Sequence, residues 1–454
     1  MNSQNQGAPV SSNYRWVICG LLFFATTFNY LDRQVISYLK PFFCSPTDTG
    51  GFGWTNTDFA NLTSAFTAFY AGMTIVAGWV IDKIGTKIGL ALSLIVWSIF
   101  GIANAFVGRL VMSHIIVRSL FAIGEGGNFP ASIKTVAEWF PKRERAFATG
   151  IFNSGSNFGA MIAALFVPWC MIHFGDQLGW KMAFIITGAV GFVWLIFWFW
   201  LYEIPSRQTR VSKAELAYIH IDDETSGDKQ TGDKAEKVSW LRLFSYRQTW
   251  SFFFGKFMTD GIWWFYLFWL PDYLIKQFGM TKQQIMLPTF IVYGIAIIGS
   301  VYGGSIPMTL IKRGMPVYKA RMLAMFLIAL APLAVLSTQY FGNVGHFGET
   351  ASILAVAVIC IGAAAHQAWS ANLFTTVSDM FPKKAVGSVT GIGAMAGGIG
   401  GVIVQKIAGA LTDAFKDSPQ HAYMIMFIIC ALSYLAAWGI MKALVPRHQP
   451  ITDL

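Results

Sequence analysis

Long apolar segments separated by short polar stretches run through almost the whole chain. About twelve segments of 18 or more mostly apolar residues can be drawn, and each is long enough to cross a hydrocarbon core of roughly 30 Å. Their approximate bounds are 15–40, 58–81, 86–108, 110–138, 146–172, 179–202, 248–277, 284–308, 320–338, 349–380, 385–413 and 420–444. The alternating pattern of a membrane β-barrel is absent. The pattern therefore predicts an all-α membrane protein with twelve transmembrane helices.

One long polar interval, residues 203–247, divides these spans into six before it and six after it. We expect an N-terminal six-helix bundle over 1–202, a cytoplasmic linker over 203–247 and a C-terminal six-helix bundle over 248–454. The stretch Asp228–Lys237 inside the linker is polar and highly charged, which predicts disorder.

The two halves contain a repeat. The segment Trp139–Gly159 aligns without a gap with Met380–Gly400, at an offset of 241 residues. The identical pairs are Phe140/Phe381, Pro141/Pro382, Lys142/Lys383, Thr149/Thr390, Gly150/Gly391, Ile151/Ile392 and Gly159/Gly400. Repeats of this kind underlie transporter folds. The same offset aligns Glu125 with His366, so two titratable groups occupy matching places.

Composition and charge support a membrane protein. The chain of 454 residues is 55% hydrophobic and only 12% charged, about half the charge usual in soluble proteins. The net charge of +10 comes from basic clusters in alternate loops, whereas residues 44–57 and 339–349 contain no Lys or Arg. This asymmetry predicts that both termini are cytoplasmic, and it makes a nucleic-acid partner unnecessary. The five cysteines form no metal or disulfide pattern, and the N-terminus lacks the features of a removable signal peptide.

Two charges interrupt the apolar fourth span. Arg118 and Glu125 are seven residues apart, which places them about two turns, roughly 10 Å, apart on one helix face. Charges at the centre of a span cost ~2.5–3.5 kcal/mol or more, so such residues usually face an interior cavity. The Arg118 guanidinium suits a carboxylate ligand, and Glu125 is the best candidate for a proton carrier. A purely structural ion pair is the alternative for both residues.

The loop between the second and third spans carries a motif with the sequence Gly78-Trp-Val-Ile-Asp82-Lys83-Ile-Gly85-Thr-Lys87. It resembles the signature loop of the major facilitator superfamily, in which the motif shapes a cytoplasmic gate. The counterpart in the second half departs from the pattern, because Pro307 stands where an acid is expected. This departure puts a symmetric gate latch in doubt.

A closer resemblance is to the anion:cation symporter family of that superfamily, which includes proton-coupled importers of sugar acids. It rests on Tyr30-Leu31-Asp32-Arg33, on Arg118 with Gly124-Glu125-Gly126, and on Glu138-Trp139-Phe140-Pro141. Within the family, Ala365-His366-Gln367-Ala368-Trp369-Ser370 is most similar to hexuronate transporters.

The resemblance implies roles for several residues. Asp32 would take part in proton coupling, and Arg33 would support it or the substrate carboxylate. Tyr30 and Tyr70 would line the pocket. Some hexuronate transporters carry a non-acidic residue in place of Asp32, so this chain either couples more protons or uses Asp32 structurally.

Further polar and aromatic residues in the spans are candidate substrate contacts: Asn153, Trp264, His366, Gln367, Ser370 and Asn372. Packing or an interhelical hydrogen bond is the alternative for His366 and for the amides. Lys256 and Asp260 are four residues apart and are expected to pair with each other. Lys134 either draws the anion toward the cytoplasm or latches the gate.

These features together predict a secondary active transporter, which imports a sugar-acid monoanion by proton symport through alternating access, with a hexuronate as the favoured substrate. Another organic anion such as a hexonate or aldarate, exchange of organic anions or phosphate, and a non-transporting nutrient sensor remain alternatives. No metal-site or nucleophile motif points to an enzyme. We expect no cofactor except the coupling proton and no metal. We expect a monomer, located in a bacterial cytoplasmic membrane.

Overall fold

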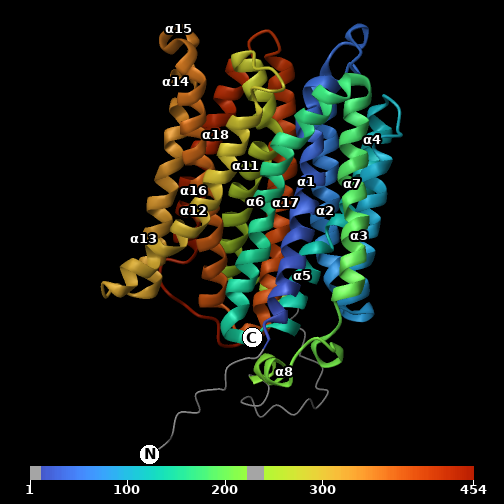
Figure 1. The fold of residues 1–454 in the computed structure, drawn as a ribbon. Helices are drawn as coiled ribbons and strands as arrows, with labels where there is room; N and C mark the ends of the chain where they lie inside the picture. The colour runs from blue at the N-terminus through green and yellow to red at the C-terminus, as the bar shows by residue number, and fades with distance from the viewer. Residues whose placement is uncertain (1–11, 222–239) are drawn as a thin grey trace, which may run out of the picture.

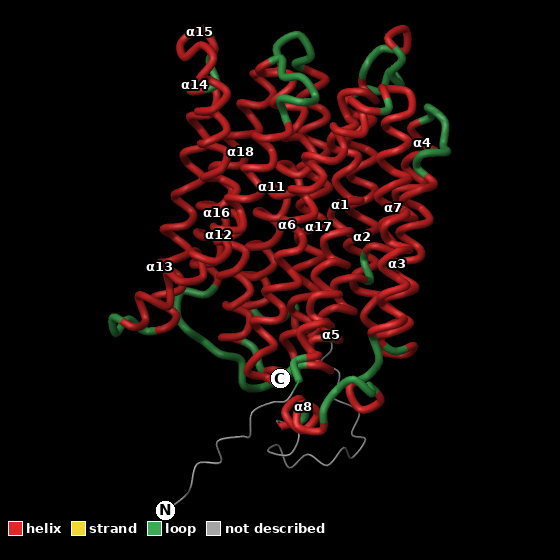
Figure 2. The backbone as a smooth tube through the Cα atoms, in the orientation of Figure 1, coloured by secondary structure: helices red, strands yellow, loops and turns green. Residues whose placement is uncertain are grey.

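The computed structural model describes residues 12–221 and 240–454, so the predicted disorder of Asp228–Lys237 falls outside it. The described residues form helices joined by loops, with no strand (Figure 2). The N-terminal half contains α1 (Tyr14–Cys44), α2 (Asn56–Ile84), α3 (Thr86–Ala103), α4 (Val111–Glu125), α5 (Asn128–Trp139), α6 (Lys142–His173) and α7 (Gly175–Leu201). The intervening segment contains α8 (Lys213–Ile219) and α10 (Trp240–Leu243). The C-terminal half contains α11 (Arg247–Phe278), α12 (Met286–Lys312), α13 (Val317–Leu330), η3 (Ala331–Ser337), α14 (Thr338–Phe341), α15 (Val344–Phe347), α16 (Ala351–Met380), α17 (Lys383–Ala414) and α18 (Pro419–Leu444).

Each of the twelve expected spans is helical, which confirms the predicted fold class. In the described part of the chain, nine helices are long and apolar enough to cross a membrane by length and composition. The other three expected spans are α1, α4 with α5, and α11. These three carry buried charges, among them Asp32, Arg118 and Asp272. The three spans that are interrupted or charged therefore carry the side chains that suggest function.

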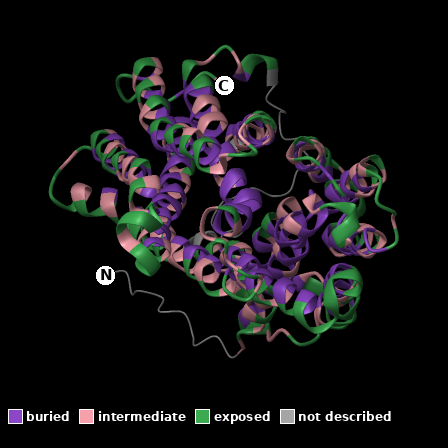
Figure 3. Ribbon diagram, turned by 90° about the horizontal axis from the view of Figure 1, so that it is seen from above, coloured by how far each residue is buried: buried purple, intermediate pink, exposed green. Residues whose placement is uncertain are grey.

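The long helices run side by side, and α8 and the C-terminus lie at the same end of the bundle as the start of α1 (Figure 1). We call this the terminal end; its charge predicts that it is cytoplasmic. Seen from above, exposed residues occupy the perimeter of the bundle and buried residues lie where helices face each other (Figure 3). Large apolar side chains such as Ile196, Val301 and Ile353 are among the exposed ones, as expected for a surface that contacts lipid.

Local sequence sets the ends of α2. Thr55 and Asp58 form a capping box at its start, with the Thr55 side chain accepting from the Asp58 N–H. At its other end Gly85 has φ of 83°, a conformation that glycine adopts without strain. The helix direction changes there, and α3 starts at the next residue, Thr86. Gly85 of the loop motif is thus required by the turn itself.

The fourth span is interrupted directly after Glu125. Helix α4 ends at this residue, and α5 begins at Asn128. A Cβ atom at Gly126 would lie 3.1–3.2 Å from Met73 and from the backbone of Tyr70. The small residue lets the interruption pack against α2, which keeps Glu125 deep inside the bundle.

The two halves meet over the part of the bundle farther from the terminal end. Helices α2 and α17 pack closely there, because a Cβ atom at Gly398 or Gly409 would collide with Ala71 or Ala60. The hydrogen bonds and ion pairs that join the halves lie in the same region: Lys40 with Asp272, Asn56 with Asp413 and Lys276, Asn61 with Lys406, Thr63 with Gln405, Ser64 with Val402, and Asp176 with Lys282. Among the residues that the structure describes, no hydrogen bond or ion pair joins the two halves in the part nearer the terminal end. The halves are thus held together at the end of the bundle opposite the terminal end.

Candidate functional site

Arg33 lies at the centre of a buried cluster between the halves. Its Nε donates to Glu125 Oε1 at 3.0 Å, and each residue is only 1% exposed. The guanidinium carbon lies 4.1 Å from the ring centre of Tyr30, 4.5 Å from that of Tyr70 and 5.2 Å from that of Trp264. Trp264 comes from α11, so Arg33 of the N-terminal half faces the C-terminal half. Rings around a guanidinium provide cation–π stabilisation and also flat surfaces for a sugar.

Arg118 lies elsewhere in the same cluster. Its Nη2 donates to the backbone oxygen of Arg33 at 2.9 Å, and its guanidinium carbon lies 4.3 Å from the ring centre of Phe121. Its Nε and Nη1 are buried without a hydrogen-bond partner in the described part of the chain. Arg118 therefore supports the main chain of α1 from within the N-terminal half, whereas the Arg33 guanidinium also contacts Trp264 of the other half.

Asp32 is buried beside Arg33 but faces a different set of helices. Its carboxylate is close to Thr187 of α7 and Trp97 of α3, and neither oxygen accepts a well-formed hydrogen bond from a described residue. Glu125 Oε2 is also without a partner there. An unpaired carboxylate in such a place is costly when it is ionised, whereas a bound proton removes the charge. The cluster thus contains two acids with unused acceptor oxygens.

Gln405 fixes the position of Trp264, and no pattern in the sequence singles this residue out. Its Nε2 donates to the Trp264 backbone oxygen at 3.1 Å, and its Oε1 accepts from Trp269 Nε1 at 2.6 Å. The hydroxyl of Thr63 in α2 is 3.2 Å from the same Oε1. The Gln405 amide thus connects Trp264, whose ring lies next to Arg33, to the contact between the halves.

Several predicted substrate contacts lie on other faces. His366 is buried against Tyr434, with Nδ1 2.8 Å from the Tyr434 hydroxyl, and it stacks on Trp263 at 5.0 Å. Asn372 Nδ2 donates to the backbone oxygen of Gly303 at 2.9 Å and so joins α16 to α12. Both side chains are engaged in packing of the C-terminal half, and the structure does not bring them to Arg33.

Three other predicted contacts are at least partly accessible. Asn153 is exposed on α6, and Gln367 and Ser370 are half-buried on α16. The structure brings Tyr30, Arg33, Tyr70, Glu125 and Trp264 together; no bond or ring contact places Asn153, Gln367 or Ser370 in that group.

The loop motif forms contacts with the N-terminal half and with the first residue of the linker. Lys134 of α5 donates to Asp82 Oδ1 at 2.8 Å, which favours the latch interpretation of Lys134. Lys87 pairs with Glu203 Oε2 at 2.8 Å, and this hydrogen bond holds the pKa of the Glu203 carboxyl below its usual value. Gly78, the first residue of the motif, is half-buried and has open space beside it.

A related latch exists in the C-terminal half despite Pro307. Glu138 at the end of α5 accepts from the Thr86 hydroxyl at the start of α3, at 2.6 Å. Its repeat counterpart Asp379 at the end of α16 pairs with Arg321 near the start of α13. An acid at the end of one span therefore holds the start of another in both halves. The side chains of Lys142, Lys383 and Lys384 lie outside what the structure describes.

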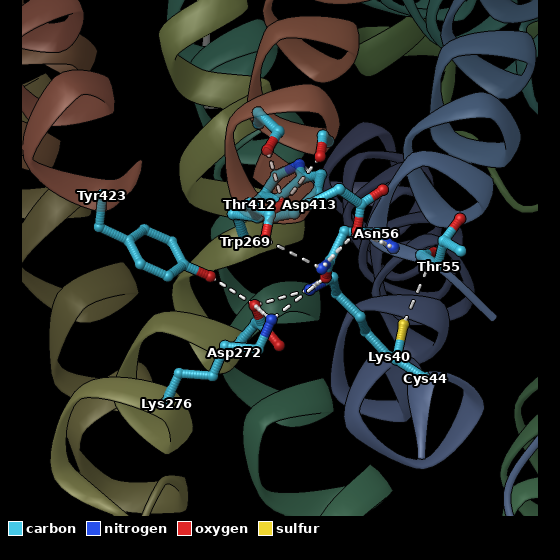
Figure 4. Close-up of polar contacts among 12 residues, drawn as sticks. Lys40, Cys44, Thr55, Asn56, Trp269, Asp272, Lys276, Thr412, Asp413 and Tyr423 are labelled. Carbon is cyan, nitrogen blue, oxygen red and sulfur yellow. Dashed lines mark hydrogen bonds and ion pairs between the residues drawn. The ribbon is translucent and has the colours of Figure 1, made fainter. Parts of the chain in front are cut away.

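A second charge cluster, which we call the outer latch, closes the far end of the bundle (Figure 4). It contains Lys40, Asn56, Asp272, Lys276, Asp413 and Tyr423. Lys40 Nζ lies 2.6 Å from Asp272 Oδ2 and 2.8 Å from Asn56 Oδ1, and the side chain is fully buried. Asp272 also contacts Lys276 at 3.2 Å and the Tyr423 hydroxyl. Each half thus contributes a charge that the other half neutralises.

Asp413 adds a second link to the outer latch. Its Oδ1 accepts from the Asn56 N–H at 2.9 Å, and its Oδ2 accepts from the Thr57 N–H at 2.7 Å. A carboxylate at a helix N-terminus is favoured by the free N–H groups and by the helix dipole. Lys40 within an apolar span was a visible signal in the sequence. Its partner could not be deduced, because Asp272 lies in the other half.

Comparison with known proteins identifies the family. The model of the Major Facilitator Superfamily matches residues 22–405. The chain belongs to the major facilitator superfamily. It is therefore a multi-pass membrane transporter and not an enzyme.

Relatives and solved structures agree with this assignment. The chain is 30% identical over 430 residues to a hexuronate transporter of Escherichia coli (strain K12). The match covers 94% of this chain and 94% of the relative. It is 26% identical to a D-galactonate transporter of Escherichia coli O6:H1, over 94% of this chain and 96% of the relative. A bacterial homolog of the human lysosomal transporter Spinster, in an inward-facing conformation, shares the fold with a TM-score of 0.72 at 18% identity, over 98% of this chain and 100% of the other.

Proposed function

We propose that this protein imports a sugar-acid monoanion, with a hexuronate as the favoured substrate, by proton symport across a bacterial inner membrane. The observation that carries the proposal is the Arg33–Glu125 pair inside an aromatic cage to which both halves contribute. The similar hexuronate and D-galactonate transporters support a sugar acid as the substrate class. We further propose a monomer with both termini in the cytoplasm.

The pair gives a direct way to couple a proton to an anion. When Glu125 is ionised it holds the Nε of Arg33 and neutralises its charge, so a substrate carboxylate is bound less favourably there. A proton on Glu125 releases Arg33, which can then bind the carboxylate through two parallel hydrogen bonds. The rings of Tyr30, Tyr70 and Trp264 are placed to pack against the sugar. Loss of the proton on the inside restores the pair and expels the anion.

The number of protons decides which gradient drives import. One proton with one monoanion is electroneutral and depends on the pH gradient alone. A second proton on Asp32 makes the step electrogenic and adds ~2.3 kcal/mol per 100 mV of membrane potential. The buried, unpartnered carboxylate of Asp32 is a suitable second carrier.

Uptake into proteoliposomes tests the proposed function. The purified protein is offered labelled hexuronates, hexonates and aldarates, with and without an inward-directed proton gradient. We expect accumulation of at least one sugar monoacid, driven by the gradient and abolished by a protonophore. Counterflow that ignores the gradient would support an exchanger instead, and saturable binding without any uptake would support a sensor.

A further inference from the structure

The C-terminal wall of the central region carries a buried ion pair that the proposed coupling mechanism does not use. Lys256 Nζ lies 2.6 Å from Asp260 Oδ2, and both residues belong to α11. The Phe374 ring centre lies 4.7 Å from Lys256 Nζ. A Cβ atom at Gly397 of α17 would collide with the Asp260 carboxylate, so the glycine provides its space. Both charges lie on one helix, so this pair does not join two helices. Its burial costs free energy without stabilising the packing between helices.

The position of the pair suits a ligand held at Arg33. Trp264, which contacts Arg33, is one helical turn from Asp260, or roughly 6 Å along the axis. A six-carbon sugar acid with its carboxylate at Arg33 and its ring against Trp264 would therefore extend toward the next turn of α11, where Asp260 lies. The Asp260 side chain remains 20% exposed although α11 packs against α1, α16, α17 and α18. Gly397, which lies against the Asp260 carboxylate, is next to Gly398, which packs against Ala71 of the other half; from this we infer that the exposed part of Asp260 faces the space between the halves.

The chemistry of the pair selects one end of a substrate. A carboxylate accepts hydrogen bonds from two hydroxyl groups, and an ammonium donates to a hydroxyl oxygen. The hydroxyl-bearing end of a sugar acid satisfies both partners while they remain paired. A second carboxylate at that end would face the negative charge of Asp260, which disfavours dicarboxylates by repulsion. Lys256 attracts such a second carboxylate only weakly, since Asp260 already neutralises its charge.

We propose that Lys256 and Asp260 form a specificity subsite, which binds the polyhydroxyl end of sugar monoacids and excludes aldarates. The subsite rests on the proposed function, because it assumes that a carboxylate is bound at Arg33. It narrows the substrate class to hexuronates and hexonates.

Competition in proteoliposomes tests the subsite. Uptake of labelled D-galacturonate, D-glucuronate or D-galactonate, whichever is fastest, is measured against unlabelled galactarate and against the unlabelled monoacid. In the wild-type protein we expect galactarate to compete at least about tenfold more weakly than the monoacid. Asp260→Asn keeps the shape but removes the charge, so it should improve the relative competition of galactarate by about tenfold or more. Asp260→Glu keeps the charge and should retain the wild-type preference.

Asp379→Asn is the matched control. Asp379 also pairs with a cation within the C-terminal half, and its side chain is similarly exposed at 23%, but it lies at the terminal end of α16. We expect its competition ratio to stay within about twofold of wild type. A wild-type protein that accepts galactarate as readily as the monoacid overturns the subsite, and so does an unchanged ratio in Asp260→Asn. A wild-type protein that accumulates none of the three monoacids overturns the proposed function itself.

Discussion

The central cluster and the outer latch both bury charges between the two halves, yet they differ in how completely those charges are satisfied. In the outer latch, Lys40, Asp272 and Asp413 all make close ion pairs or hydrogen bonds. In the central cluster, Asp32, Arg118 and Glu125 all retain buried polar atoms without a partner in the described part of the chain. Buried polar groups are usually paired, so unpaired ones need an explanation.

The difference separates a closed contact from a working site. The outer latch has little left to bind, which suits a contact that holds the two halves together at this end. The central cluster has unused donors on Arg118 and unused acceptors on two acids, which suits a site that exchanges a proton and an anion. Ion pairs of similar length can therefore serve opposite purposes, and the unpaired atoms distinguish them.

The largest expected effect is at Arg33. Arg33→Lys removes the planar fork and should weaken sugar-acid binding by about 100-fold, because an ammonium cannot hold a carboxylate in the same bidentate way. Arg118→Lys should cost about tenfold or less, since Arg118 supports α1 from behind. Binding measured by calorimetry on purified variants checks the order. Equal losses, or a larger loss for Arg118→Lys, would contradict the geometry.

Breaking the outer latch should shift the conformational equilibrium. Lys40→Met leaves Asp272 without its partner from the other half, and loss of one member of a buried pair typically costs about 3–5 kcal/mol. Thr63→Cys, in a background without the native cysteines, reports opening because Thr63 is fully buried between α2 and α17. Labelling of this cysteine by a membrane-impermeant thiol reagent should accelerate at least about tenfold in Lys40→Met.

Lys406 provides the control for that experiment. It also bonds across the halves, to Asn61, but this contact is exposed. Lys406→Met should change the labelling rate less than about twofold, because exposed polar contacts contribute little. Equal acceleration in both variants would show that burial does not set the strength of these contacts.

Within the outer latch, a smaller effect than that of Lys40→Met is expected at Asp413. Asp413→Asn retains one acceptor for the Asn56 and Thr57 N–H groups but loses the favourable charge at the start of α2. Such a charge contributes about 0.3–1 kcal/mol, so labelling of Thr63→Cys should accelerate no more than about fivefold. A change as large as that of Lys40→Met would mean that helix capping, not the ion pair, holds the halves.

The sequence predicted the spans because hydropathy over a long segment is a local property. It also pointed to Glu125, since a charge in an apolar span is visible without any structure. Which side of a helix faces the other half depends on how the helices pack. For that reason the sequence predicted both Arg118 and Arg33 as carboxylate contacts and could not tell which of them has a ring from the other half beside it; in the structure this is Arg33, next to Trp264. His366 matched Glu125 across the repeat, yet its ring packs between Trp263 and Tyr434.

The account rests on competition between Glu125 and the substrate carboxylate for Arg33, and proton uptake on binding measures that competition directly. Titration of the identified sugar acid into the detergent-solubilised protein, in buffers of different ionisation enthalpy, gives the number of protons bound per substrate. We predict a value near one for Glu125, with any further proton assigned to Asp32, at a pH where both acids start ionised. In Glu125→Gln the uptake should fall by about one proton while the substrate still binds. Substrate binding without proton uptake by the wild-type protein, or equal uptake by Glu125→Gln, would contradict the account.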